Sequence, residues 1–451
     1  MTGTKSTVLP RPRAASQPRL LRQLFRQPLP VLDELNSTVG PVCGLGFGPF
    51  RFAIVGDPSA IRELLSQPSD RFRWNHKFNV LGFVVGKRSM LVSDGADHKR
   101  RRTSVQAGFS RRRLDGWVPM IVNRTDSAID KLIESTQPGD TVDLYPFGRT
   151  LIIDIVVRAL FGDRLSTQTA EIEAGFGRAQ DYLAGSLFQQ LPHRVPYTAR
   201  SRVRADRRGL DAIIDEQIAE SRRHPLTESR DVLDDLVQSG ELSDAEIRDQ
   251  VVTLIGAGYD TTAAALAWIL WRVTLHDGLW KRIRDEADLV IGEPTHLSAD
   301  ESNILPRLEL ANRSMRETLR LHPTASLAPR EATTDVIVGG YVIRRGTLIL
   351  WSPYLAGRDA SAWRDPLTFD PDRFADPSES ERAVADAAWV PFGRGPRACI
   401  GFALAQMELT LIIARVAQRL DLSPTSTEVP QPFGLIANRP TGGVPMHVSP
   451  R

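Results

Sequence analysis

The chain has 451 residues, of which 41% are hydrophobic and 25% are charged, and its formal net charge at pH 7 is +3. This composition is typical of a globular protein with ample material for a core, and the weak net charge gives no general argument for nucleic-acid binding. Two cysteines are too few for a disulfide framework, which indicates a reducing cytoplasm. Length alone suggests about three domains.

The N-terminal segment, residues 1–30, differs in composition from the rest of the chain. It contains lysine and arginine but no acidic residue, and it lacks the apolar core of a signal peptide. We expect a flexible basic tail here, disordered or lightly docked. An arm that binds a membrane surface or a partner is the alternative.

Helical patterns dominate the chain after this segment. Apolar residues have helix-compatible spacing over 121–132, 151–161, 210–218, 251–275, 279–291, 307–321 and 400–420. Strand-like stretches are few and cover 52–55, 336–343 and 347–351. The sequence therefore predicts a mainly α fold with a small β part.

A basic run lies in the segment SDGADHKRRRTSV. His98 and Arg102 are four positions apart and share one face of a predicted helix. The run from Lys99 to Arg102 could form a solvated basic face, whereas the lack of interleaved aromatic residues disfavours nucleic acid.

The longest predicted helix covers residues 244–275, after a capping box formed by Ser243 and Glu246. At 1.5 Å per residue it would be about 48 Å long. Its segment 251–271 is apolar except for Asp260, whose cost of ~3 kcal/mol at the centre of a bilayer argues against a membrane span.

The same helix contains residues that are unfavourable in a helix interior, in the segment GAGYDTT. Each glycine costs about 1 kcal/mol relative to alanine, and a buried carboxyl or hydroxyl group needs a partner. A threonine can also bond the carbonyl four residues earlier and bend the helix. A kinked packing helix would account for the segment without any chemistry.

Two further patterns follow. In RETLRLHP, Glu317 and Arg320 share a helix face, an arrangement that is usually a surface ion pair worth less than ~1 kcal/mol. In FGRGPRACIG, Cys399 directly precedes an apolar helix, whose positive end favours the thiolate. Arg397 adds a cation, and Gly401 leaves space for a large flat group. A buried structural cysteine would explain neither the arginine nor the glycines.

The segment 392–401 resembles the pattern F-x-x-G-x-R-x-C-x-G of the cytochrome P-450 family at every fixed position. The resemblance implies that Cys399 is the thiolate ligand of haem iron, with Phe392 near the sulfur and Arg397 paired with a haem propionate. A thiolate ligand pushes electron density onto the iron and favours cleavage of the O–O bond.

Other motifs are similar to those of the same family. Glu317 and Arg320 match its E-x-x-R pair, which Arg373 in FDPDRF would complete as a structural triad. The resemblance also implies propionate ligands, which are His98, Arg102 and Arg330.

Residues 257–262 match the family signature A/G-G-x-D/E-T-T. In that signature Thr261 would hydrogen-bond the iron-bound peroxo species, and Asp260 would supply protons through water.

These motifs converge on one cofactor, haem b, so we expect residues 31–451 to form a single catalytic domain rather than three. The haem would lie between the long distal helix and the proximal loop and helix that carry Cys399. Because no flavin or nicotinamide motif is present, electrons would come from a separate ferredoxin and ferredoxin reductase. An acidic partner could meet Lys99 and Arg100.

The resemblance implies a cytoplasmic haem-thiolate monooxygenase that inserts one oxygen atom of O₂ into an organic substrate. The alternatives are a peroxide-driven peroxygenase and a non-catalytic haem sensor, and the intact Asp260–Thr261 pair disfavours both. An apolar pocket would favour a lipophilic substrate, although apolar lining is common to small-molecule sites. The predicted lining residues are Phe78, Leu81, Phe83, Leu254, Ala257, Ala325, Leu327, Leu435 and Ile436.

Overall fold

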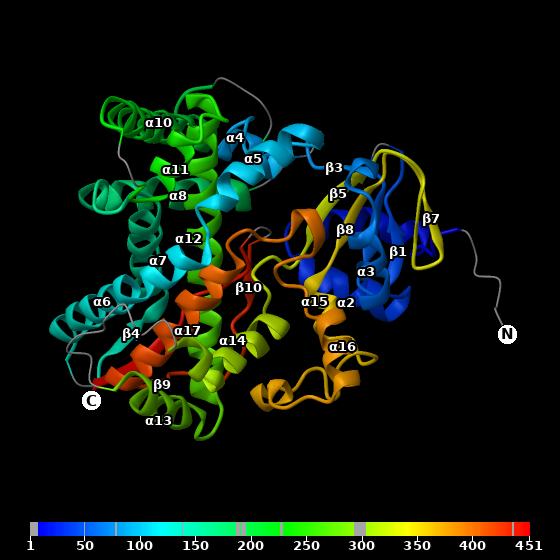
Figure 1. Ribbon diagram of the computed structural model, residues 1–451. Coiled ribbons are helices and arrows are strands. Elements are labelled where there is room, and N and C mark those ends of the chain that lie inside the picture. Colours follow the sequence, from blue (N-terminus) through cyan, green and yellow to red (C-terminus); the bar gives the residue numbers. More distant parts are fainter. Residues whose placement is uncertain are drawn as a thin grey trace.

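The computed structural model describes residues 8–48, 50–76, 79–137, 139–185, 190, 195–225, 229–292, 304–434 and 437–451. Three residues of the predicted substrate pocket, Phe78, Leu435 and Ile436, lie outside the described residues. A large helical part lies beside a smaller part rich in strands (Figure 1).

The helical part surrounds the long helix α12 (Asp244–Leu275), which runs through its whole height (Figure 1). The other helices of this part are α5 (Gly95–Ala107), α6 (Arg111–Ser135), α7 (Leu144–Phe161), α8 (Thr169–Ala184), α10 (Ala199–Arg223), α11 (Val232–Gln238), α13 (Leu279–Ile291), α14 (Glu309–Leu321) and α17 (Phe402–Arg419). The predicted helices are therefore present, and several extend beyond the predicted bounds.

The strand-rich part contains a five-stranded sheet in the order β1-β2-β8-β5-β3. Its strands are β1 (Val42–Leu45), β2 (Phe52–Val55), β8 (Leu348–Trp351), β5 (Ala328–Ala332) and β3 (Phe72–Arg73). All neighbours are antiparallel except β2 and β8, which are parallel. The helices near this sheet are α1 (Gln17–Leu24), α2 (Pro28–Thr38), α3 (Pro58–Ser66), α15 (Pro353–Ala356) and α16 (Glu379–Ala388).

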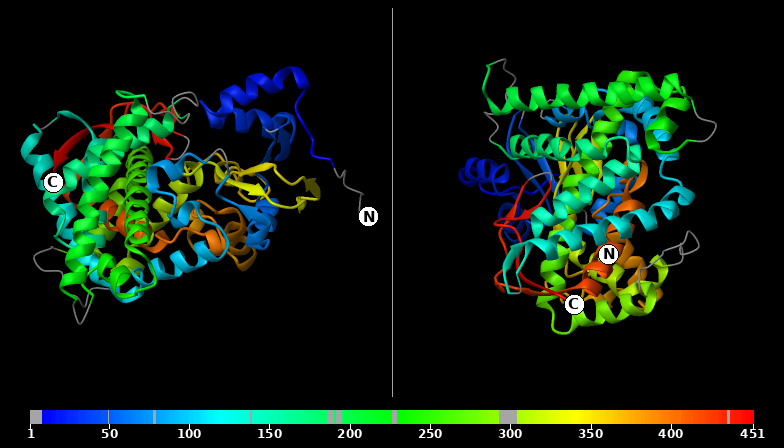
Figure 2. Two further views of the ribbon diagram at one scale, coloured as in Figure 1. Left: turned by 90° about the horizontal axis from the view of Figure 1, so that it is seen from above. Right: turned by 90° about the vertical axis from the view of Figure 1, so that its left-hand side faces the viewer.

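Short strands complete the fold. One three-stranded sheet joins β4 (Thr141–Asp143), β12 (Pro445–Pro450) and β9 (Leu420–Pro424), and two hairpins pair β6 (Val336–Val338) with β7 (Tyr341–Ile343) and β10 (Pro432–Phe433) with β11 (Arg439–Pro440). The short helix α4 (Leu81–Val85) precedes α5. The two further views in Figure 2 show the helical and strand-rich parts packed together.

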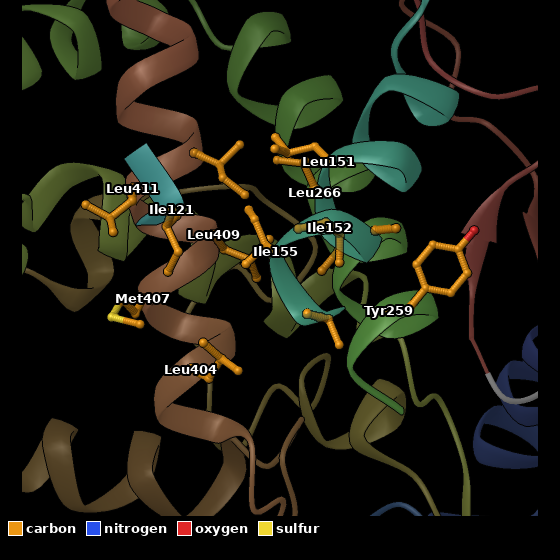
Figure 3. Packing of buried hydrophobic residues seen from close by; sticks show 14 of the residues in the cluster. Ile121, Leu151, Ile152, Ile155, Tyr259, Leu266, Leu404, Met407, Leu409 and Leu411 are labelled. Atoms are coloured by element: carbon orange, nitrogen blue, oxygen red, sulfur yellow. The ribbon is translucent and has the colours of Figure 1, made fainter. Parts of the chain in front are cut away.

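Helix α12 starts where the sequence predicts. The backbone N–H of Ser243 donates to the Glu246 carboxylate at 3.1 Å. Most residues of this helix are buried because α7, α14 and α17 pack around it. Figure 3 shows this core, where Ile155 of α7 lies beside Leu409 of α17 and Leu266 of α12 lies beside Leu151 of α7. In the described part of the chain, no helix is long and apolar enough to span a bilayer.

From residue 8 onward, the N-terminal segment is docked on the strand-rich part of the protein. Residues 17–24 form α1, and its Leu20 and Leu24 are buried beside Cys43 of β1. Arg11 donates to the carbonyl of Gly46 at 2.6 Å. The basic residues are on the exposed face of an amphipathic helix, so the segment from residue 8 is packed onto the protein by its leucines.

Candidate functional site

Cys399 lies at the end of a tight loop that leads into α17. Gly393 and Gly395 have φ angles of +68° and +70°, which side chains other than glycine rarely permit. The N–H of Cys399 donates to the carbonyl of Phe392 at 2.8 Å. The glycines and this hydrogen bond therefore fix the backbone of Cys399 just before the helix.

Cys399 is an exposed residue, although protein atoms lie around its thiol. Burial raises the pKa of the Cys399 thiol, whereas the backbone N–H of Gly401 and the cation of Arg102 lower it. A Cβ atom added to Gly401 would lie 4.0 Å from the sulfur, so glycine leaves the space beside it open. We expected Arg397 to be the cation beside the sulfur, but Arg102 is the charged group that acts on it.

Four groups that can carry positive charge lie near one another beside α5. His98 and Arg102 come from α5, Arg330 from β5, and Arg397 from the 3-10 helix Gly395–Arg397. Burial, with the charge of Arg397 next, lowers the pKa of Arg330 to about 10. Burial followed by the charges of Arg397 and Arg102 lowers the pKa of His98 to about 4.

Acidic compensation for this cluster is small. Among the described residues, the four groups make one ion pair, between Arg397 and Asp94 at 3.3 Å. Arg397 also stacks on Trp74, with its Cζ 3.8 Å from the ring centre. The Nε atoms of Arg330 and Arg397 are buried and have no hydrogen-bond partner in the described structure. Three partly or fully buried arginines with this little acidic compensation fit a ligand with two carboxylates, such as the propionates of haem.

Glu317 joins two arginines in the interior of the protein. Arg320 donates to both carboxylate oxygens of Glu317, at 2.7 and 2.8 Å, and Arg373 donates to one of them at 3.0 Å. The side chains of Glu317 and Arg320 have 0% exposure. Arg320 also donates to the carbonyls of Gly357 and Thr368, which lie in the segment leading to the Cys399 loop. The pair is therefore not the exposed ion pair that such spacing usually forms.

The glycines of α12 allow neighbouring groups to come close. A Cβ atom at Gly256 would lie 2.7 Å from a ring carbon of Phe176 in α8. One residue later, Ala257 is exposed, whereas residues 251–255 of this helix are buried. The hydroxyl of Thr261 donates to the carbonyl of Ala257 at 2.6 Å. This face of the helix therefore borders an accessible space, and its threonine makes the bond that bends helices.

Asp260 is mostly buried, and its Oδ1 atom has no hydrogen-bond partner among the described residues. Burial raises the pKa of Asp260 to about 7, against the opposing effects of Arg149 and Arg439. The carboxyl can therefore exchange a proton near neutral pH.

A polar network beside Asp260 was not predicted. The Nε of Arg149 in α7 donates to the hydroxyl of Tyr259 at 2.5 Å, and that hydroxyl donates to Glu173 of α8 at 3.5 Å. No motif identifies Arg149 or Glu173, because their meeting depends on how α7 and α8 pack against α12. Trp74 and Asp94, which contact Arg397, were also missed, because they meet it only through tertiary packing.

The predicted substrate-pocket residues lie in several places. Leu254 is buried in α12, and Leu327 packs against the N-terminal cluster of α1 and α2. Ala325 is half-buried in the turn before β5, and Leu81 begins α4. The ring of Phe83 in α4 contacts Tyr182 of α8, with their centres 5.5 Å apart.

A separate cavity of about 220 Å³ lies between α8, α10 and α12. Phe176, Val203 and Val252 are among its apolar lining residues, and an ion pair of Arg178 with Asp206 lies at its wall. None of the predicted pocket residues lines it.

Two basic residues of α5 were predicted to meet an acidic partner. Arg100 forms an ion pair with Glu246 at the start of α12, and its side chain is still 37% exposed. Lys99 is exposed.

The fold and the site define a haem-thiolate protein, with an accessible cysteine before a helix and an under-compensated cationic cluster near it. A family model described as Cytochrome P-450 matches residues 16–444. The chain therefore belongs to the cytochrome P-450 family, whose cofactor is haem b, and is an enzyme of its monooxygenase class. The family resemblance seen in the sequence is thus confirmed.

Relatives and a solved structure agree. Cytochrome P-450 139 of Mycobacterium tuberculosis is 31% identical over 417 residues, covering 91% of this chain and 95% of the relative. Pentalenene oxygenase of Streptomyces avermitilis is 31% identical over 405 residues, covering 87% and 86%. Cyclooctat-9-en-7-ol 5-monooxygenase of Streptomyces melanosporofaciens is 29% identical over 413 residues, covering 89% and 86%.

The solved structure is a cyanobacterial cytochrome P-450 with bound retinoic acid, which has a TM-score of 0.85 and 22% identity and covers 99% of this chain and 100% of that chain. This similarity confirms the predicted fold.

Proposed function

We propose that this enzyme inserts one oxygen atom of O₂ into a lipophilic organic substrate, with electrons supplied by a separate ferredoxin and ferredoxin reductase. The observation that carries the proposal is the mostly buried Asp260 carboxyl beside Thr261 on a helix face that borders accessible space. An oxygenase needs protons delivered without bulk water, and a carboxyl that exchanges protons near pH 7 suits this role.

Residues near Cys399 would hold the cofactor. The Cys399 thiolate would bind the iron, with Phe392 and Gly401 beside it, and the groups of His98, Arg102, Arg330 and Arg397 would bind the propionates. When bound, haem supplies the activation of O₂. The triad of Glu317, Arg320 and Arg373 would hold the proximal segments in place and take no part in the reaction.

On the other side, Asp260 and Thr261 would manage protons. Asp260 would take a proton from solvent and release it toward the space beside Ala257 through water. The Thr261 hydroxyl, which donates to the Ala257 carbonyl at 2.6 Å, would hold that water by accepting a hydrogen bond from it. Proton delivery at this position would favour oxidation of the substrate over release of hydrogen peroxide.

The substrate class rests on the apolar residues expected around the site and on two relatives. Pentalenene oxygenase and cyclooctat-9-en-7-ol 5-monooxygenase carry names that denote an alkene and an unsaturated alcohol. We therefore place hydrophobic carbon compounds first among the candidate substrates. The reducing cytoplasm is the proposed location, because neither Cys43 nor Cys399 forms a disulfide.

The test is a screen of hydrophobic compounds for those that displace water from ferric haem, read as a shift of the Soret band. Hits are then assayed with ferredoxin, its reductase and NADPH. We expect substrate-dependent consumption of O₂ and a product with one added oxygen atom from ¹⁸O₂. Product formed only with hydrogen peroxide would instead establish a peroxygenase, and binding without any turnover would establish a sensor.

A further inference from the structure

The hydrogen bond between Arg149 and Tyr259 connects α7 to the turn of α12 that carries Asp260 and Thr261. The hydroxyl of Tyr259 accepts from the Nε of Arg149 at 2.5 Å, and the Arg149 Cζ lies 5.4 Å from the centre of the tyrosine ring. Tyr259 has 0% exposure. Figure 3 shows it at the edge of the aliphatic core, with its hydroxyl directed away from that core. A fully buried ring with a bonded hydroxyl limits rotation of this helical turn.

Glu173 holds the other end of the network. It accepts from the Tyr259 hydroxyl at 3.5 Å and from the Thr150 hydroxyl at 3.3 Å, and its carboxylate lies 3.9 Å from Arg149. The side chains of Arg149 and Glu173 are 24% and 23% exposed. The network therefore extends from a buried hydroxyl beside Asp260 to groups that reach solvent.

Among the cations that lower the pKa of Asp260, Arg149 has the largest effect. Arg439 of β11 also favours the Asp260 carboxylate, but it is paired with Asp181 of α8 at 3.4 Å, and Asp181 has the opposite effect. Burial disfavours the ionised form of Asp260, and the charge of Arg149 is the strongest of the effects that favour that form.

We propose that Arg149 is a positioning residue for the oxygenase reaction: its hydrogen bond to Tyr259 orients the turn of α12 that carries Asp260 and holds the Arg149 charge near that carboxyl. This inference rests on the proposed role of Asp260 in proton delivery. Arg149 touches neither the cofactor nor the substrate in this assignment. Glu173 completes it by accepting from the Tyr259 hydroxyl and by lying 3.9 Å from Arg149.

The first measurement does not depend on turnover. In the ferric holoenzyme, the infrared band of the protonated Asp260 carboxyl is identified by its loss in Asp260→Asn and is titrated with pH. In Arg149→Gln we expect half-protonation to move to higher pH, by about one pH unit for the loss of one nearby cation. Tyr259→Phe should move it in the same direction by less, because Arg149 keeps its charge but loses its anchor.

The matched control is Arg158→Gln. Arg158 lies on the same helix, is also mostly buried and forms an ion pair with Asp154 at 3.0 Å, yet it is not among the charges that act on Asp260. Its loss should leave the Asp260 titration unchanged. An unchanged titration in Arg149→Gln and Tyr259→Phe overturns the proposal, and so does an equal change in Arg158→Gln.

The second measurement is the pH dependence of coupling, the product formed per NADPH consumed. In the wild-type background, Arg149→Gln should move the alkaline limb of the coupling profile to higher pH. In the Asp260→Asn background it should not move that limb. A shift that persists without Asp260 overturns the proposal. If Asp260→Asn itself leaves coupling unchanged, the proposed function fails at Asp260, while the infrared titration still decides whether Arg149 controls that carboxyl.

Discussion

The backbone N–H of Cys399 and the carbonyl oxygen of Phe392 form a 2.8 Å hydrogen bond that closes the loop before α17. Neither side chain takes part in this bond. The loop can therefore keep its shape when the thiol is replaced, so a substitution at Cys399 tests the iron ligand without unfolding the loop.

We expect Cys399→Ser to fold but to lose the red-shifted carbon-monoxide band of the ferrous protein, because no thiolate remains to bind iron. Cys43→Ser is the control, since Cys43 is fully buried in the N-terminal cluster and burial raises the pKa of its thiol to about 12. Its band should be normal. A normal band in Cys399→Ser would remove Cys399 from the ligand position.

Glu317→Ala should destabilise the protein by about 3–5 kcal/mol, because it leaves the buried cation of Arg320 without its carboxylate. The yield of haem-loaded protein should fall sharply. Glu220→Ala is a matched control, because Glu220 and Arg223 have the same spacing and lie 2.8 Å apart, but they are 44% and 62% exposed. Denaturant unfolding of both variants measures the difference, and equal small losses would contradict a structural triad.

Thr261→Ala should bind haem and substrate but misdirect protons, so that more of the reductant ends as hydrogen peroxide. A loss of ~1.4–2.7 kcal/mol on the productive path changes the partition about tenfold to a hundredfold. Asp260→Asn should slow turnover with less leakage, because the hydroxyl of Thr261 remains. Product and peroxide per NADPH are measured together.

Thr274→Ala controls for the helix bend. Thr274 lies on the same helix and bonds the carbonyl of Leu270 at 2.8 Å, four residues back, as Thr261 bonds Ala257. Its coupling should equal that of the wild type. If both threonine variants couple normally, Thr261 acts only on helix shape.

Arg330→Met should have opposite effects on the two forms of the protein. In the haem-free form it removes a buried cation whose Nε has no described partner, so the free energy of unfolding should rise. In the holoprotein it removes a propionate partner, so haem should transfer faster to a competing haem-binding protein. Thermal unfolding and the transfer rate test this prediction, and unchanged transfer would exclude Arg330 from the propionate site.

Glu408→Gln should change how stability depends on pH. Glu408 of α17 is 1% exposed, and burial raises its pKa from 4.5 to about 8. The folded protein therefore keeps a proton that the unfolded chain releases above pH 4.5, so this contribution to stability declines as pH rises toward 8 and is constant beyond. The variant should gain stability relative to the wild type across that window in denaturant titrations. A constant difference would show that the carboxyl is ionised throughout.

The sequence predicted those parts of the fold that depend on local pattern. The capping box at Ser243 and the turn glycines at 393 and 395 are local, and the structure has the helix start and the loop at those positions. Periodicity also located most of the helices of the core. Motif spacing predicted the residues around Cys399, because each motif is short.

Contacts between distant segments were not predictable in this way. The packing of α1 through Leu20 depends on a cluster that includes β1 and β8. The Arg149–Tyr259 bond joins positions that are far apart in sequence, and it depends on the angle at which α7 meets α12. Side-chain partners of this kind follow from tertiary packing, on which a single sequence gives little information.

The close fit of Gly256 against Phe176 has an evolutionary consequence. A methyl group at position 256 would require the ring at 176 to withdraw, and Phe176 also lines the cavity beside α8. A variant with alanine at 256 therefore starts from a less fit background until position 176 becomes smaller. The two positions should change together, because a smaller side chain at the buried position 176 leaves a void that costs stability and that a methyl group at 256 partly fills.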